Sequence, residues 1–126
     1  MSKLFGPDFI ALQVRDLEIS KLFYMEQLQL SLADQCPPGA VVFKTSPIPF
    51  AIRTAAIDLS ASPQLGWGVA IWLACKDADF FYESLRKAAV PILTPIHDGP
   101  FGRFFTFKDP DGYSITLHTK TTHATT

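Results

Sequence analysis

The chain has 126 residues, of which 48% are hydrophobic and 18% charged, and its formal net charge is −1. This balance is typical of one globular domain and argues against nucleic-acid binding, which usually needs a basic surface. No stretch contains the roughly 18 apolar residues that a membrane-spanning helix needs. Because the N-terminal sequence MSKLFGPDF lacks the apolar run of a signal peptide, we expect a cytoplasmic protein.

The first half of the chain begins with a strand followed by a helix. FIALQV (9–14) is rich in β-forming residues and is expected to be a strand. Asp16 provides an N-cap for a helix over about 17–29, where apolar residues recur with a 3.6-residue period. Three short strands, separated by proline-rich turns, are expected to follow near 31–35, at 40–45 and at 49–54.

The second half repeats this order of elements. GVAIWLAC (68–75) is expected to be a strand, Asp77 an N-cap, and ADFFYESLRKAAV (78–90) a helix. The remaining strands are expected near 92–97, at 102–108 and at 113–118. The order is the same in both halves when Asp16 is aligned with Asp77, so we interpret the chain as an internal βαβββ duplication. The two modules span about 7–54 and 67–119, and the linker spans 55–66.

The last two expected strands form a hairpin with a recognisable turn. Its sequence is GRFFTFKDPDGYSITLH, and the turn is Asp109-Pro110-Asp111-Gly112. Proline supplies a fixed φ, glycine allows a positive φ, and aspartate side chains accept hydrogen bonds from nearby amides. We therefore interpret both aspartates as structural. Cys36 and Cys75 form no CxxC pair and are expected to be free thiols without a catalytic role.

Taken together, these segments resemble the vicinal oxygen chelate superfamily, which includes glyoxalases, bleomycin resistance proteins and extradiol dioxygenases. The resemblance covers about residues 7–119, and its most specific part is the Gly-Arg, aromatic strand and Asp-Pro-Asp-Gly turn at 102–112. It implies an α+β fold in a single domain over 1–126. In that fold, two βαβββ modules form a curved eight-stranded mixed sheet around a cleft, with the helices on the outer face.

The resemblance also implies where a metal would bind. Carried onto this sequence, the three ligand positions of metal-using members fall on Phe9, Ala70 and Thr116. Phenylalanine and alanine have no ligand atom and a lone threonine hydroxyl is a poor ligand, so we expect no metal and no cofactor. A register slipped by two residues leaves Gln13 and His118 as the only conceivable ligand pair, and two neutral ligands bind a divalent ion weakly.

Strand alternation places Phe9, Gln13, Trp72 and Thr116 on faces opposite the aliphatic residues. The full set of ligand-binding candidates is Phe9, Gln13, Phe43, Phe50, Trp67, Trp72, Phe101, Arg103, Thr116 and His118. Such a surface favours flat or apolar ligands, with a few polar groups to orient them. Core packing is the alternative for most of the phenylalanines, and an ion pair with Asp98 or Glu83 is the alternative for Arg103. No catalytic residue is assigned.

Among members of the superfamily, the chain is most similar to the metal-free bleomycin resistance type. That similarity implies antibiotic resistance by sequestration of a small molecule in an aromatic cleft, and a homodimer with no nucleic-acid or membrane partner. The charge of −1 departs from the acidic surface that a cationic drug requires, so the ligand is left open. Two alternatives are a metal-dependent glyoxalase- or dioxygenase-like enzyme with non-standard ligands, and a non-catalytic interaction or regulatory module.

Overall fold

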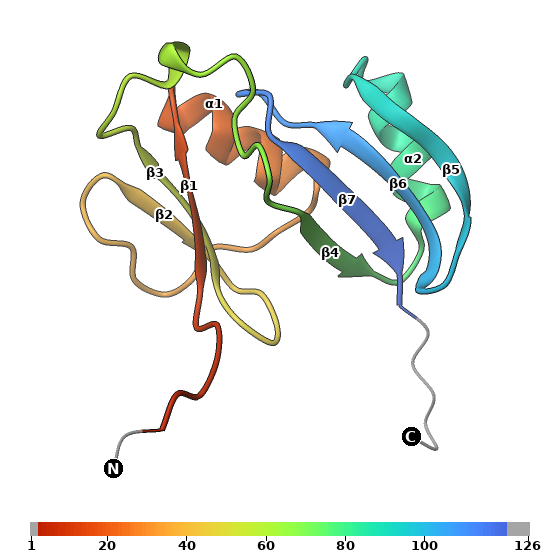
Figure 1. Cartoon of the computed structure of the whole chain (residues 1–126), viewed down its shortest axis with the longest axis horizontal. Coiled ribbons are helices and arrows are strands. Elements are labelled where there is room, and N and C mark those ends of the chain that lie inside the picture. The colour runs from red at the N-terminus through yellow and green to blue at the C-terminus, as the bar shows by residue number, and fades with distance from the viewer. Residues whose placement is uncertain (1–2, 121–126) are drawn as a thin grey trace. The chain divides into compact units, whose positions relative to one another are not determined.

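A computed structural model describes residues 3–120 of the chain. The chain divides into two compact units, one ending at Ala61 and the other beginning at Ser62, here called unit 1 and unit 2. Each unit contains one β sheet and one α-helix (Figure 1). The fold is therefore α+β, as the sequence predicts. None of the helices in the described part of the chain is long and apolar enough to cross a bilayer.

The sheet of unit 1 has three strands in the order β1-β3-β2. They are β1 (Ile10–Val14), β2 (Ala40–Phe43) and β3 (Phe50–Thr54). β1 is parallel to β3, and β2 is antiparallel to β3. A short 3-10 helix, η2 (Leu59–Ala61), ends the unit.

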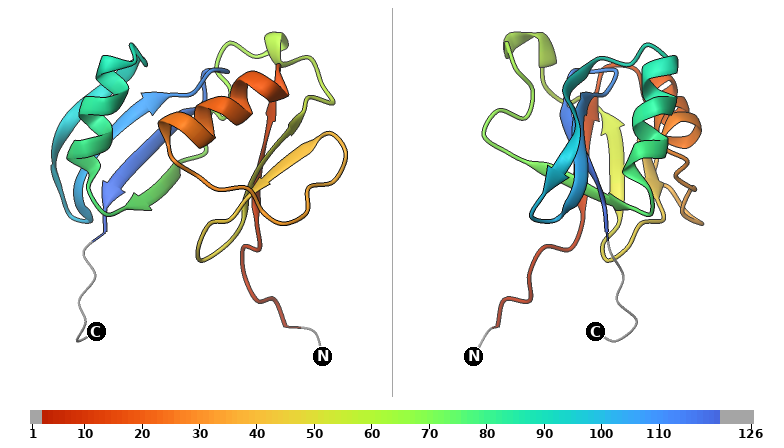
Figure 2. Two further views of the ribbon diagram at one scale, coloured as in Figure 1. Left: turned by 180° about the vertical axis from the view of Figure 1, so that it is seen from behind. Right: turned by 90° about the vertical axis from the view of Figure 1, so that its right-hand side faces the viewer.

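The helix of unit 1 begins at the residue that the sequence indicates. The Asp16 side chain accepts a hydrogen bond of 3.1 Å from the backbone N–H of Ile19, which caps α1 (Leu17–Leu22). The helix continues as a π-helical turn, η1 (Phe23–Gln27). α1 packs against β2 and β3, and Figure 2 shows both the helix and these strands.

The core of unit 1 lies between this helical segment and one face of the sheet. Tyr24 is fully buried, and its ring centroid lies 5.8 Å from that of Phe43 and 5.2 Å from that of Phe50. Leu12 and Ile52 are buried on the same face of the sheet. Because side chains alternate along a strand, the residues between them lie on the opposite face, which no helix of unit 1 covers.

Unit 2 has a four-stranded sheet in the order β4-β7-β6-β5. Its elements are β4 (Ile71–Cys75), α2 (Ala78–Lys87), β5 (Ile92–Gly99), β6 (Gly102–Lys108) and β7 (Ser114–Thr119). β4 is parallel to β7, and the other neighbouring strands are antiparallel. In both units the first strand is parallel to the last, and the last is antiparallel to the strand that precedes it, which is consistent with an internal duplication.

The helix of unit 2 is capped and packed in the same way as that of unit 1. Asp77 accepts a hydrogen bond of 3.2 Å from the Phe80 N–H, and α2 packs along β5, β6 and β7 (Figure 2). Phe105 and Phe107 of β6 are fully buried, and the Tyr82 ring meets Phe105 edge-on at a centroid distance of 5.2 Å. The face of the sheet opposite α2 carries the alternate residues of each strand.

The strand expected near 31–35 is not formed. The described residues contain seven strands in two sheets, because segment 31–35 pairs with β2 only at one bridge, Leu32 with Phe43. Two backbone hydrogen bonds of 2.8 Å flank this bridge, from Ala33 to Val42 and from Lys44 to Ser31. Pro37 and Pro38 then follow; proline has no N–H to donate, so it cannot extend the ladder.

Candidate functional site

Small side chains on neighbouring strands form the floor of a hollow on the open face of the unit 1 sheet. Ala11 of β1 lies opposite Ala51 of β3, and Ala51 lies opposite Val42 of β2. Ala40 of β2 contributes to the same floor. Ala51 at the centre of the floor is 7% exposed and Ala11 is exposed. The outer face of a sheet usually carries polar residues, so these four apolar positions suit a ligand or partner.

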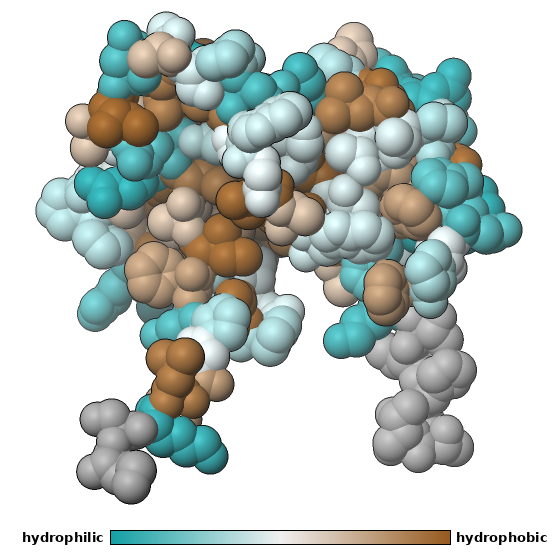
Figure 3. Space-filling view, viewed as in Figure 1, coloured by the Kyte–Doolittle hydropathy of each residue, from teal (hydrophilic) through white to brown (hydrophobic). Residues whose placement is uncertain are grey.

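Bulkier residues surround this floor. They are Phe9, Pro37, Pro38 and Pro49, and together with the floor they enclose a hollow of about 570 Å³, here called the unit 1 hollow. Figure 3 looks onto this side of the sheet and shows brown and pale residues over β1 and its neighbours. Small-molecule sites typically have volumes of about 300–1,000 Å³ and mostly apolar walls, so the hollow has the size and lining of a ligand site.

Two charged residues, Asp8 and Arg53, also line the unit 1 hollow, and both are exposed. Gln13 lies opposite Arg53 in the parallel pairing of β1 with β3. The Gln13 side-chain oxygen accepts a hydrogen bond of 2.7 Å from the Ala56 N–H. That bond anchors the segment after β3 to β1, so part of the polar capacity of Gln13 is used within the protein.

The open face of the unit 2 sheet carries an aromatic cluster centred on Trp72. The Trp72 ring lies 5.3 Å from that of Phe104, 5.5 Å from that of His118 and 6.1 Å from that of Phe101, centroid to centroid. The Trp72 side chain is nevertheless 43% exposed and Phe101 is 67% exposed. We call Trp72, Phe101, Phe104 and His118 the unit 2 cluster. It offers exposed ring faces and edges on which a flat ligand can stack.

In both His97 and His118, Nδ1 lies close to a backbone carbonyl oxygen, and Nε2 is the other ring nitrogen. Nδ1 of His118 lies 2.9 Å from the Phe101 carbonyl oxygen, and Nδ1 of His97 lies 2.7 Å from that of Pro95. A carbonyl oxygen only accepts hydrogen bonds, so each Nδ1 carries the hydrogen when the ring is neutral. Nε2 of each ring then presents a lone pair. The His97 ring also packs on Phe104 at a centroid distance of 4.1 Å.

Thr116 lies beside the unit 2 cluster but is buried. It is the β7 neighbour of Trp72 and is 8% exposed. Its hydroxyl oxygen lies 2.8 Å from that of Thr106, the residue opposite it on β6. The two hydroxyl groups hydrogen-bond to each other. Thr116 is therefore a buried polar residue next to the unit 2 cluster and a poor ligand for a cation.

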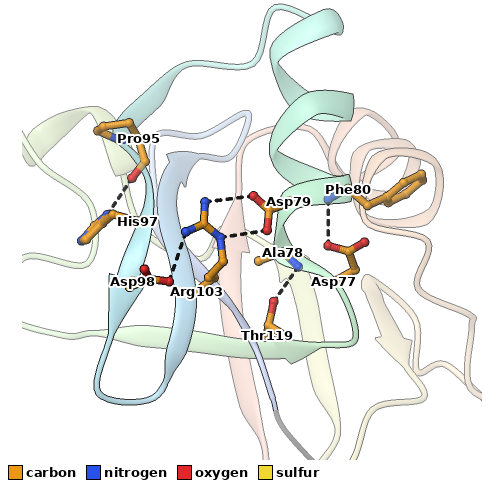
Figure 4. Close-up of polar contacts among 9 residues, drawn as sticks. All are labelled: Asp77, Ala78, Asp79, Phe80, Pro95, His97, Asp98, Arg103 and Thr119. Carbon is orange, nitrogen blue, oxygen red and sulfur yellow. Dashed lines mark hydrogen bonds and ion pairs between the residues drawn. The ribbon is translucent and has the colours of Figure 1, made fainter.

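Arg103 lies on the side of the sheet that faces α2. Its Nε and Nη2 donate to Asp79 of α2 at 2.9 and 3.1 Å, and its Nη1 donates to Asp98 of β5 at 3.1 Å (Figure 4). These hydrogen bonds, first to Asp79 and then to Asp98, raise the pKa of Arg103. The predicted alternative, an ion pair with Asp98, is therefore present. The pair with Asp79 was not predicted, although Arg103 alternates in step with the buried Phe105.

The remaining predicted ligand-binding residues divide between core and surface. Phe43 and Phe50 are 0% and 3% exposed and form the core of unit 1 with Tyr24. Trp67 lies in the loop before β4 and is 84% exposed, and Phe9 is 60% exposed. The sequence analysis missed the alanine floor, Arg53 and Phe104. Phe104 was detectable, because it alternates with Phe105 and Phe107 and so lies on the opposite face.

The residues at the metal positions of the superfamily do not fit a metal. Phe9 and Ala70 offer no ligand atom, and the Thr116 hydroxyl is paired with Thr106. Within residues 3–120, no group of three or more His, Cys, Asp and Glu side chains is close enough together to bind an ion. We therefore derive no reaction step through a metal.

The two thiols should react at different rates. Cys36 is exposed, whereas burial raises the pKa of the Cys75 thiol, so the thiolate of Cys75 is populated only at higher pH. At pH 8, Ellman's reagent should modify Cys75 several-fold more slowly than Cys36, and raising the pH should narrow the difference. The Cys36→Ser variant should retain only the slow phase. Equal rates for the two thiols would contradict this assignment.

An α+β chain made of two like modules, each with a helix on one sheet face and the other face open, is the architecture that the sequence predicts for the vicinal oxygen chelate class. The chain belongs to this family: the model of the Glyoxalase/Bleomycin resistance protein/Dioxygenase superfamily matches residues 6–117. Among proteins with curated descriptions, none matches the chain significantly.

Several solved structures are similar to this chain. A protein of unknown function from Agrobacterium tumefaciens is 25% identical, with a TM-score of 0.70 over 93% of this chain and 94% of that one. The fosfomycin resistance protein FosX from Listeria monocytogenes is 19% identical, with a TM-score of 0.73 over 94% and 96% of the two chains. Lactoylglutathione lyase from Agrobacterium tumefaciens is 18% identical, with a TM-score of 0.63 over 92% and 94%. At these identities, the last two show the fold alone.

Proposed function

We propose that this protein binds a flat or apolar small molecule and sequesters it without a metal, in the manner of the bleomycin resistance type of its superfamily. The unit 1 hollow is the observation that carries the proposal. Its volume of about 570 Å³ and its floor of alanine and valine side chains suit a flat, apolar body. Membership of the superfamily supports small-molecule binding in general but does not select among its activities.

The unit 2 cluster is proposed as a separate stacking surface within unit 2. Trp72 and Phe101 remain partly exposed although each contacts another aromatic ring, so their free surface is available for stacking. We retain Phe9, Gln13, Trp67, Thr116 and His118 as proposed ligand contacts. We leave out Phe43 and Phe50 because they are core residues, and Arg103 because Asp79 and Asp98 occupy its guanidinium group.

We also propose that the protein acts in the cytoplasm as a homodimer, as its resemblance to the resistance proteins implies. We propose antibiotic resistance on the same basis, the resemblance to the resistance proteins. The FosX protein of Listeria monocytogenes has that role by name, but the likeness to it concerns the fold. Resistance is tested by expressing the protein in a sensitive host and comparing growth across a panel of planar antibiotics, with the Ala51→Trp variant as control.

The metal-free part of the proposal predicts the result of elemental analysis. Protein incubated with zinc, nickel, manganese or iron and then dialysed should retain far less than one ion per chain, because Phe9 and Ala70 provide no ligand atoms. A variant with Ala70→His and Thr116→Glu, which adds two ligand side chains to one face of the unit 2 sheet, is the matched control and should retain more metal. Stoichiometric retention by the unmodified protein would contradict the proposal and favour an enzyme with non-standard ligands.

Ligand binding is tested with N-phenylnaphthylamine (NPN), a flat, neutral fluorophore that brightens when it leaves water. The natively folded protein should bind NPN saturably at one site per chain, with unchanged near-ultraviolet circular dichroism. A linear, non-saturating response would mean that the apolar surfaces are not a binding site, and the interaction-module alternative would then be preferred.

A further inference from the structure

The unit 1 hollow contains a cation, Arg53, whose side chain has no partner among residues 3–120. Arg53 lies on β3, two residues after the floor residue Ala51 and therefore on the same face. Within residues 3–120, its guanidinium group makes no ion pair and no side-chain hydrogen bond. Arg103, by contrast, is held by two aspartates. Arg53 thus has five N–H donors that remain to be satisfied by water or by a ligand.

The other charged residue of the hollow lies at its opposite end. β1 and β3 are parallel, and Arg53 is opposite Gln13, whereas Asp8 precedes Gln13 by five residues along the chain. Asp8 and Arg53 therefore do not neutralise each other across the hollow. An anion placed near Phe9 would be repelled by Asp8, whereas an anion placed near Gln13 would meet Arg53.

Resting on the function proposed above, we infer that the ligand of the unit 1 hollow is an organic anion. Its flat or apolar body lies on the alanine floor and its single anionic group, such as a carboxylate or sulfonate, pairs with Arg53. A guanidinium group suits this role because it binds a planar carboxylate through two parallel hydrogen bonds. The alternative, that water alone solvates the Arg53 side chain on the central strand, predicts no preference for anions.

The inference is tested with two probes that share one aromatic body. Anilinonaphthalene sulfonate (ANS) carries the anilinonaphthalene body of NPN together with one negative charge. The unmodified protein should bind ANS about tenfold more tightly than NPN at low salt. This preference should decrease as sodium chloride is added, because salt screens the interaction with an exposed arginine.

Substitutions at Arg53 test whether this residue causes the preference for ANS over NPN. Arg53→Gln should remove it by weakening ANS binding about tenfold, with NPN binding changed less than about twofold. Arg53→Lys should retain part of it, because the charge remains and the planar fork is lost. Lys21→Gln is the matched control: it removes one positive charge from α1, which covers the other face of the sheet, and should alter neither probe.

The outcomes separate this inference from the proposed function. Equal affinity for the two probes, or a preference that survives Arg53→Gln, would overturn the anionic ligand while leaving the proposed function intact. Failure of the folded protein to bind either probe would overturn both. Loss of the ANS preference in Arg53→Gln, with NPN binding retained, is the supporting result.

Discussion

Replacing Ala51 with tryptophan should weaken NPN binding by about tenfold or more, which corresponds to a loss of at least about 1.4 kcal/mol. Ala51 lies at the centre of the floor, opposite Ala11 on one side and Val42 on the other. An indole at this position would occupy the space that the ligand body needs. NPN binding is measured by isothermal titration calorimetry. Heat is recorded instead of fluorescence, so the fluorescence of the introduced tryptophan does not disturb the measurement.

The control for this substitution is the same change at an exposed position outside the hollow. Ala88 follows α2 in unit 2 and is exposed, so Ala88→Trp should bind NPN as the unmodified protein does. Both variants should retain the circular dichroism of the folded protein, since tryptophan is well accepted in a strand such as β3 and Ala88 is exposed. Unchanged affinity in folded Ala51→Trp would show that NPN binds elsewhere.

The second large effect concerns stability rather than binding. Asp109 is 4% exposed, and its Oδ1 accepts hydrogen bonds of 2.9 Å from the N–H groups of Asp111 and Tyr113. Asp109→Ala would leave two amides of the turn without an acceptor, at about 1–3 kcal/mol for each buried group. We expect the free energy of unfolding to fall by about 2–4 kcal/mol.

Urea denaturation of two further variants tests this explanation. Asp109→Asn keeps an oxygen in the same place and should lose clearly less stability than Asp109→Ala. Asp34→Ala removes an exposed carboxylate that forms a surface ion pair with Lys44, and such pairs contribute about 0–1 kcal/mol. If Asp109→Ala were as stable as Asp34→Ala, the turn would not depend on the Asp109 side chain.

Local patterns in the sequence predicted the fold where each feature depends on residues close together in the chain. Asp16 and Asp77 cap their helices as expected, because an N-cap needs only an amide three residues further on. The prediction of a strand near 31–35, made by the same local reasoning, was wrong. This segment is Ser-Leu-Ala-Asp-Gln and lacks the β-branched and aromatic residues that favour strands, and it pairs with β2 at one bridge, Leu32 with Phe43.

The candidate site was less predictable because it depends on register between strands. Nothing in the sequence places Ala11 opposite Ala51, and three alanines separated by tens of residues give no local signal. Trp72 could be assigned to the open face because it differs from its aliphatic neighbours within one strand. Arg103 lies two residues before the buried Phe105, and this spacing already indicated the side of the sheet that faces α2, where Arg103 pairs with Asp79.

The alanine floor has a consequence for how this domain can diverge. Its residues alternate along the strands with the buried residues Leu12, Val41 and Ile52, so the same three strands form the ligand surface on one face and the core on the other. Mutations at Ala11 or Ala40 can therefore change the shape of the hollow without altering core packing. Selection can explore new ligands at little cost in folding, which is one physical route by which a single fold acquires many specificities.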